Sequence, residues 1–372
     1  MQRKMYGILL LLIISLGCIV LYIARESPSD STGRTANYVK GVVLSAEMAD
    51  RLDEYGHHRG QNLTLRLLSG PDNGKVVESF QPLSPRPQDF DTLLSPNDRI
   101  IVGIDNDNGV IIYYFSDFDR SLSFYTLLAV FVLSLVYFGR IIGLKSLVGI
   151  GISLFVLWRG FIYAMLQPDI NIYFMALTFC FIISFLVLIV LSGASVKTWA
   201  ALLGTWGGLV IASVLAYLSI HIMHLTGLDT EEAYTLKASI VPFLDFHGVL
   251  FASMIVASLG AIIDVTISIA SAQLEVYESS PRITWRELYS KGMNVGKDIM
   301  GAMSITLILA YVGSSLPLLL LIALDKHTPF ARILNLPMIT TEFVRALVGS
   351  IGLIYAIPLT ALVMAIILPR KS

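Results

Sequence analysis

The chain has 372 residues, of which 55% are hydrophobic and 14% are charged, whereas ordinary soluble proteins have roughly 45 to 50% apolar and about 25% charged residues. Together with a mean hydropathy of +0.73, this composition indicates that most of the chain uses lipid as its solvent, which excludes an ordinary soluble enzyme. The formal net charge of −1 gives no basic surface for nucleic acid.

Recurring apolar segments predict an all-α polytopic membrane helix bundle. We expect eight transmembrane spans, because eight segments of about twenty residues are long enough to cross a hydrocarbon core of about 30 Å. These segments are 5–24, 122–139, 146–166, 171–191, 199–221, 247–270, 299–324 and 344–368. Residues 122–372 then form a membrane domain of seven helices.

The distribution of basic residues predicts the orientation of these spans. With the N-terminus in the cytoplasm, the inside connections carry eleven Lys and Arg and the short outside connections carry three. The eleven are Arg3, Lys4, Arg140, Lys145, Lys197, Arg282, Arg286, Lys291, Lys297, Arg370 and Lys371, and the three are Lys237, Lys326 and Arg332. Because cytoplasmic loops carry the excess of basic residues, both termini are expected inside.

The first apolar segment has two interpretations. Arg3 and Lys4 before an apolar run are also typical of a secretory signal peptide, and Leu16-Gly17-Cys18 resembles a lipoprotein cleavage site. The apolar run continues past Cys18, and Ser15 stands where a lipoprotein has an aliphatic residue. We therefore interpret residues 1–24 as an uncleaved transmembrane anchor.

Residues 25–121 differ in character, since ten Lys and Arg stand against fifteen Asp and Glu, and turn-forming residues separate short alternating runs. This composition predicts a small extracytoplasmic all-β domain, either an OB-like barrel or a sandwich. The predicted strands are 38–44, 63–68, 75–80, 99–104 and 110–115.

Asp264 is the main candidate for a functional residue within the membrane. A charge at the centre of a bilayer costs about 2.5 to 3.5 kcal/mol on insertion scales, so such residues are functional candidates by default. Ser268, Ser271 and Glu275 follow Asp264 on one helical face, which predicts a polar path toward the cytoplasm. The alternative is a protonated Asp264 that hydrogen-bonds a neighbouring helix.

Three further charges lie in or near apolar spans. Arg159 lies toward the outer end of the third span, where it either snorkels to the interface or forms a structural ion pair. Glu342 and Arg345 are spaced i, i+3 at the mouth of the eighth span, so they can pair with each other.

Small and polar residues mark two of the spans. The fifth span has Ala200, Gly204, Gly208, Ala212 and Ala216 at intervals of four, which predicts close packing against another helix. The seventh span carries Ala302, Thr306, Ala310 and Ser314 at the same interval. It continues into Ser315-Leu316-Pro317, where a helix break is expected because proline lacks a backbone donor. Pro358 is a similar candidate in the eighth span.

The connection 272–298 is the one sizeable cytoplasmic loop in this topology. Thr284 and Glu287 form a capping-box pattern, which predicts a helix near 284–296 with an apolar edge. We expect this helix to rest on the inner leaflet, with basic residues near anionic headgroups. A docking site for a cytoplasmic partner is the alternative.

All six histidines lie on the outer side in this topology. His221, His224 and His247, assisted by Asp245 or Asp229, are weak candidates for a metal or proton site, and interfacial histidines without a ligand are the alternative. The spacing of Asp229 and Glu232 is typical of a helix N-cap with its reciprocal partner.

Several motifs in the membrane domain resemble the YibE/F family of bacterial multi-pass membrane proteins. The specific motifs are Gly260 to Val265 around Asp264, Gly296 to Gly301 around Lys297 and Asp298, Ala310 to Ser315, Val348 to Gly352 and Ile357 to Thr360, with Ser192 to Lys197 and Gly204 also fitting. The resemblance covers about 120 to the C-terminus and implies a multi-pass topology in a bacterial inner membrane. Ile305 is a departure, because we expect Asn there.

The sequence contains no Walker loop, nucleophile elbow, His-Glu-x-x-His motif or dinucleotide fingerprint, so we expect neither an enzyme nor a cofactor. Our leading hypothesis is an inner-membrane permease-like protein that moves an ion or small solute along a polar path. The residues expected to line that path are Asp264, Ser268, Ser271, Asp298, Thr306, Ser314, Ser315 and Glu342. The alternative is a non-transporting envelope scaffold or assembly factor whose outer domain binds a partner. Membrane lipid, a homo-oligomer and an envelope protein are the expected partners.

Overall fold

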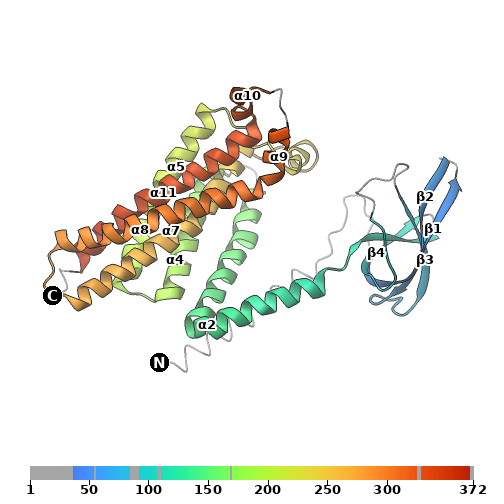
Figure 1. Ribbon diagram of the computed structural model, residues 1–372, viewed down its shortest axis with the longest axis horizontal. Coiled ribbons are helices and arrows are strands. Elements are labelled where there is room, and N and C mark those ends of the chain that lie inside the picture. Colours follow the sequence, from blue (N-terminus) through green and yellow to red (C-terminus); the bar gives the residue numbers. More distant parts are fainter. Residues whose placement is uncertain are drawn as a thin grey trace. The chain divides into compact units, whose positions relative to one another are not determined.

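The computed structural model describes residues 37–53, 56–83, 92–107, 110–167, 170–324 and 328–368. The chain divides into two compact units, Met1–Phe138 and Gly139–Ser372, and each is described by itself. Figure 1 shows the strands of the first unit and the helices of the second. The expected anchor at 5–24, and with it the choice between anchor and signal peptide, lies outside the described residues.

The first unit contains a five-stranded antiparallel sheet of order β3-β2-β1-β4-β5. Its strands are β1 (Asn37–Asp53), β2 (Gly56–Leu67), β3 (Val76–Pro82), β4 (Arg99–Asp107) and β5 (Val110–Phe118). All five predicted strands are present. β1 and β2 extend beyond their predicted ends because they pair as one long hairpin as far as Asp53 and Gly56.

Alternate residues of these strands form the core of the sheet. Val39 and Val43 of β1 pack with Leu63, Leu65 and Leu67 of β2, and none of these side chains is more than 6% exposed. Strand residues alternate between the two faces, so the hydrophobic run of each strand fixes which face is buried. β3 and β5, at the two ends of the sheet, also contact each other. The choice between a barrel and a sandwich stays a prediction.

Asp119 links the sheet to the first long helix, α2 (Ser121–Phe155). Its carboxylate accepts hydrogen bonds from the backbone N–H and the hydroxyl of Ser121, and it lies 3.1 Å from the Lys40 ammonium of β1. The Ser121 hydroxyl is the largest cause that lowers the pKa of Asp119 to about 2, and Lys40 adds to it. Asp119 therefore stays ionised and satisfies donors at the start of α2.

Helices make up the second unit, together with the part of α2 that follows residue 138. The long helices are α4 (Ile172–Ser192), α5 (Val196–Ile222), α7 (Phe246–Ser279), α8 (Trp285–Ser314) and α11 (Pro337–Ile367). Shorter helices are α3 (Tyr163–Met165), α6 (Glu231–Thr235), α9 (Leu316–Leu324) and α10 (Phe330–Leu334), and the π-helical turns are η1 (Val156–Ile162) and η2 (Leu236–Ile240).

Within the described residues, six helical segments are long and apolar enough to cross a membrane. They are 121–165, 172–192, 196–222, 246–279, 285–314 and 337–367. The first comprises α2, η1 and α3 and covers two expected spans, 122–139 and 146–166, with Arg140 between them in a non-helical conformation (φ 48°, ψ −122°).

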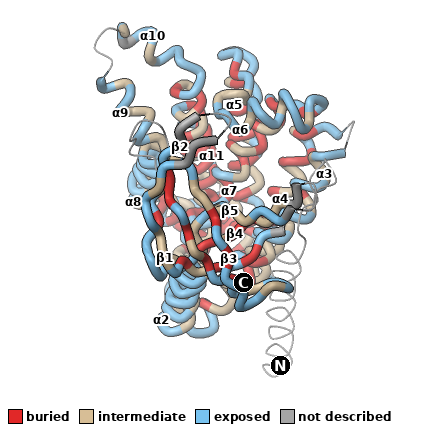
Figure 2. Tube along the Cα trace, turned by 90° about the vertical axis from the view of Figure 1, so that its right-hand side faces the viewer, coloured by how far each residue is buried: buried red, intermediate tan, exposed pale blue. Residues whose placement is uncertain are grey.

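α5, α7 and α11 form the centre of the second unit. Figure 2 shows that buried stretches concentrate on these three helices, whereas α8 is mostly exposed. All members of the predicted small-residue stripe on α5 are buried, which confirms its position at a helix interface. A Cβ atom added at Gly208 would lie 2.8 Å from both the Ala356 Cβ and the Gly352 carbonyl oxygen of α11. The two backbones can approach this closely because the side chains between them are absent.

The expected arrangement around the seventh span is partly wrong. The capping box at Thr284 and Glu287 is present, but the helix it starts is α8, which runs without interruption to Ser314 rather than ending near residue 296. Gly292 and Gly296 pack this part of α8 against Gln273 of α7 and Ile357 of α11, so it lies on the bundle and not apart from it. The expected break follows, since α9 begins at Leu316. α11, by contrast, continues through Pro358.

The close contact of α5 and α11 predicts the effect of adding one methyl group. Gly208→Ala should destabilise the full chain by about 1 to 3 kcal/mol, as overpacking does in other cores. Gly301→Ala is the matched control, because no heavy atom of the described chain lies within 4 Å of a Cβ at that helical position. Thermal unfolding in one detergent should give a lower midpoint for Gly208→Ala alone; equal midpoints would contradict the close packing.

Candidate functional site

A cavity of about 680 Å³ lies between α7, the junction of α8 and α9, and α11. The segment 227–233, which follows α5 and includes the first residues of α6, lines one side of it. Although the surrounding helices are apolar, the lining includes three charged side chains, Asp229, Glu342 and Arg345. Hydroxyls of Thr230, Ser253, Ser314, Ser315 and Thr341 add to this polar lining.

Glu342 and Arg345 form the expected i, i+3 pair in the first turns of α11. The Arg345 Nη1 atom donates to the Glu342 Oε1 atom at 2.8 Å, and the two side chains are only 24% and 27% exposed. Arg345 Nη2 also lies 3.4 Å from the Ser253 hydroxyl of α7. Glu342 Oε2 and Arg345 Nε are shielded from solvent and have no hydrogen-bond partner among the described residues. The pair therefore leaves one acceptor and one donor unused.

Asp229 connects the 227–233 segment to α11. Its Oδ2 atom accepts a hydrogen bond of 2.5 Å from the Thr341 hydroxyl. The expected N-cap role of Asp229 is wrong, because Thr230 caps α6 instead, accepting from the backbone N–H of Ala233. Within the described part of the chain, no Lys, Arg or His forms an ion pair with Asp229. The cavity thus contains a carboxylate without a cationic partner.

A second, apolar cavity of about 180 Å³ adjoins the first. Ser315, Leu318 and Glu342 line both cavities. The other residues around the second cavity come from α8, α9 and α11, and they are Ile308, Tyr311, Val312, Leu319, Ile339, Phe343, Ala346 and Leu347. A polar cavity and an apolar one therefore share a wall that includes Glu342.

Asp264 and Ser268 do not line these cavities. Both are exposed on α7, and the Ser268 hydroxyl donates to the Asp264 carbonyl oxygen of its own helix at 2.7 Å. Ser271, one turn further, lies 3.4 Å from the ammonium of Lys197 at the start of α5. Asp298 and Thr306 are exposed on α8, where the Thr306 hydroxyl donates to Ala302. Of the eight expected path residues, the structure brings Ser314, Ser315 and Glu342 together in the polar cavity.

The cavity and Asp264 nevertheless share one face of α7. Ser253 lines the cavity, and Asp264 follows it by eleven positions, or about three helical turns. Gly260 lies between them on that face, and a Cβ there would meet no heavy atom of the described residues within 4 Å. Ser271 continues the same face. A stripe of small and polar residues therefore runs from the cavity past Asp264 to Lys197.

Arg159 is exposed in η1, and no ion pair joins it to another described residue. The expected structural ion pair is therefore present for Arg345 but not, among the described residues, for Arg159.

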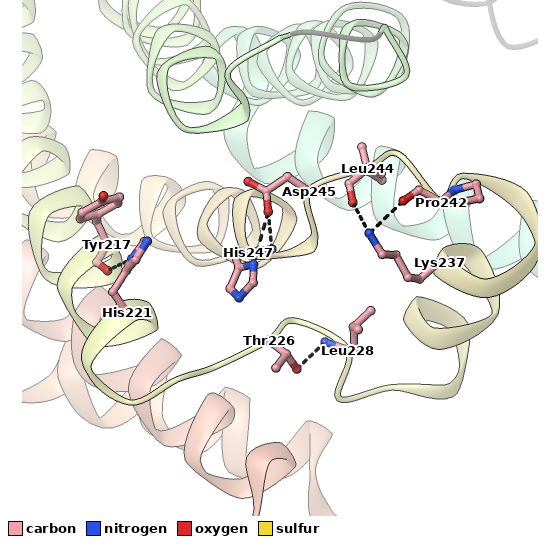
Figure 3. Close-up of polar contacts among 9 residues, drawn as sticks. All are labelled: Tyr217, His221, Thr226, Leu228, Lys237, Pro242, Leu244, Asp245 and His247. Carbon is pink, nitrogen blue, oxygen red and sulfur yellow. Dashed lines mark hydrogen bonds and ion pairs between the residues drawn. The ribbon is translucent and has the colours of Figure 1, made fainter.

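Two of the three histidine candidates, His221 and His247, take part in separate local contacts, drawn in Figure 3. The His221 Nδ1 atom lies 2.8 Å from the Tyr217 carbonyl oxygen, and the His247 Nδ1 atom lies 3.4 Å from the carboxylate of Asp245, the N-cap of α7. His224 has a positive φ of 53° after the end of α5. The described residues contain no group of three or more His, Cys, Asp or Glu side chains that could hold a metal ion.

A family model described as YibE/F-like protein matches residues 127–370 of the chain. The matched region includes the whole polar cavity and the α7 stripe. The chain belongs to the YibE/F-like family. No curated protein and no solved structure matches the chain.

Four polar residues of the cavity lining were not predicted as part of the site from the sequence: Asp229, Thr230, Ser253 and Thr341. Ser253 was detectable, because it lies on the helical face already marked by Asp264 and Ser271. The pairing of Asp229 with Thr341 was not, since the two residues are 112 positions apart and meet only when α11 packs beside the 227–233 segment.

The Glu342–Arg345 pair in this YibE/F-like protein predicts a measurable coupling. Glu342→Gln and Arg345→Gln should each destabilise the chain, and the double variant should lose about 1 kcal/mol less than the sum of the two. The matched control is the exposed pair Asp117 and Arg120 of the first unit, also at 2.8 Å and i, i+3, where water screens the charges and the coupling should be near zero. Double-mutant cycles from chemical unfolding test this, and equal coupling in both pairs would contradict the shielding of Glu342 and Arg345.

Proposed function

We propose that this YibE/F-like protein is an integral inner-membrane permease-like protein that moves an ion or small solute. The proposal places both termini in the cytoplasm and residues 25–121 outside, following the distribution of Lys and Arg. It assigns no chemical transformation and no cofactor to the chain. The six long apolar helices support a membrane setting.

One observation carries the proposal. A polar cavity with three charged side chains lies among apolar helices, and its α7 wall continues as a small and polar stripe that includes Asp264. Burying a polar or charged group costs free energy unless the group is paired, is hydrated or binds a ligand. A solute path accounts for both the unpaired carboxylate of Asp229 and the position of Asp264.

The positions of these residues suggest the order in which a solute would meet them. The solute enters the cavity from the outer side, where the 227–233 segment and the α8–α9 break form its walls. The break at Ser314 and Ser315 supports this role, since interrupted helices offer free backbone groups at transport sites. Asp264 then interacts with a proton or cation on the way to Ser271, and Asp298 lies at the cytoplasmic mouth.

A scaffold function is the second candidate, and the exposed apolar side chains of the β sheet favour it. Tyr38, Met48, Ile111 and Ile112 are all at least 45% exposed on the first unit. A surface of this kind can bind an envelope protein. Deleting residues 30–115 should then abolish the function, while neutralising Asp264 should leave it intact.

Flux through the reconstituted protein tests the permease proposal. In proteoliposomes with a trapped pH dye or a potassium indicator, a membrane potential should drive proton or cation entry, and Asp264→Asn should reduce it at least tenfold. Glu78→Gln, which removes an exposed carboxylate on β3, is the control for reconstitution and should leave the flux unchanged. Undiminished flux in Asp264→Asn would reject the role of Asp264, and no flux in the wild-type chain would favour the scaffold.

A further inference from the structure

We infer that the paired cavities bind an amphipathic organic cation, with a primary ammonium head in the polar cavity and a short alkyl tail in the apolar one. This inference rests on the proposed function and names the substrate class of the same site. It starts from the shared wall of the two cavities, since Ser315, Leu318 and Glu342 line both of them.

The charges of the polar cavity favour a cationic head. Its described lining contains two carboxylates, Asp229 and Glu342, and one guanidinium, Arg345. Arg345 is already neutralised by Glu342 at 2.8 Å, so the negative charge of Asp229 is left over. An anionic head would have to displace Glu342 from Arg345 and would lie in the same cavity as Asp229. A monocation restores neutrality without breaking the pair.

The hydrogen-bonding groups favour a primary ammonium, which has three N–H donors and no acceptor. Asp229 has a second carboxylate oxygen besides the one bonded to Thr341. The hydroxyls of Ser253, Ser314 and Ser315 add neutral acceptors. An ammonium group among them can donate to the Asp229 carboxylate and to these hydroxyls.

The adjoining cavity favours an alkyl tail. Apart from Ser315, Glu342 and the Tyr311 hydroxyl, its lining is apolar, and its volume is about 180 Å³. A cavity of about 150 Å³ lined by Leu, Ile and Phe stays dry and takes up benzene, so a chain of six carbons is of suitable size. Each buried methylene should strengthen binding about fourfold. The head and tail of one molecule can therefore occupy both cavities at once.

Binding of n-hexylammonium to the full chain in lipid nanodiscs, measured by calorimetry at pH 7 with empty nanodiscs subtracted, tests this inference. Methylammonium keeps the head without the tail and should bind at least a hundredfold more weakly. Hexanoate keeps the tail with the opposite charge and should bind at least tenfold more weakly. Asp229→Asn, whose amide oxygen can still accept from Thr341, should weaken hexylammonium at least tenfold, whereas hexanoate should bind no more weakly than to the wild type.

Two outcomes would overturn the inference: equal affinity for hexanoate and hexylammonium, or equal affinity for methylammonium and hexylammonium. An unchanged affinity in Asp229→Asn would overturn the assignment of the head to the polar cavity. Glu78→Gln serves again as the control variant and should bind all three probes as the wild type does. Failure of the proposed function is distinguishable, because hexylammonium would then bind as expected while the proteoliposome flux is absent. Flux without hexylammonium binding would reject the substrate class alone.

Discussion

The close approach of α5 to α11 is the constraint on which the second unit depends. Gly208 and Gly352 bring the two backbones together, and α7 packs across both, with Ile262 against each glycine. α8 packs tightly only in its first half, where Leu288, Gly292 and Gly296 are its buried residues. Beyond them no described residue of α8 is buried, although Ile299, Met303 and Leu307 still pack against the core. The two cavities lie at this end of α8, near its junction with α9. The tightly packed part of α8 and the candidate site are therefore at opposite ends of the helix.

Local patterns of the sequence predicted those features that depend on neighbours within one helix or strand. The α5 stripe, the capping box of Thr284 and Glu287, the break before Leu316 and the pair of Glu342 and Arg345 each involve residues within a few turns, and each is present. Features that depend on distant parts of the chain were missed. Nothing local separates the first turns of α8 from the rest of that helix, and the contact between Asp229 and Thr341 requires the packed bundle. We expected a separate interfacial helix, but Gly292 and Gly296 pack this part of α8 against α7 and α11.

The same packing determines what surrounds the face of α7 that Asp264 shares with other residues. The face of α7 that carries Ser253, Gly260, Asp264 and Ser271 is exposed at Gly260 and Asp264, while Ser253 contacts Arg345 of α11 and Ser271 contacts Lys197 of α5. A carboxylate on such a face would be unfavourable against hydrocarbon. In the proposed path, water or a solute along the stripe would remove that cost and would connect Asp264 to the polar cavity through Ser253. The unpaired groups of the cavity and the position of Asp264 then have one explanation, a hydrated path, rather than two.

Whether water reaches the α7 stripe is the central claim, and thiol labelling measures it most directly. In a chain with Cys18 and Cys180 replaced by Ala, Gly260→Cys places a thiol on the stripe, and Val210→Cys places one on the exposed apolar face of α5. A membrane-impermeant methanethiosulfonate, which reacts with hydrated thiolates, should modify the thiol at 260 at least tenfold faster than the thiol at 210 in lipid vesicles. Equal, slow rates at both positions would show a dry stripe and contradict the proposed path.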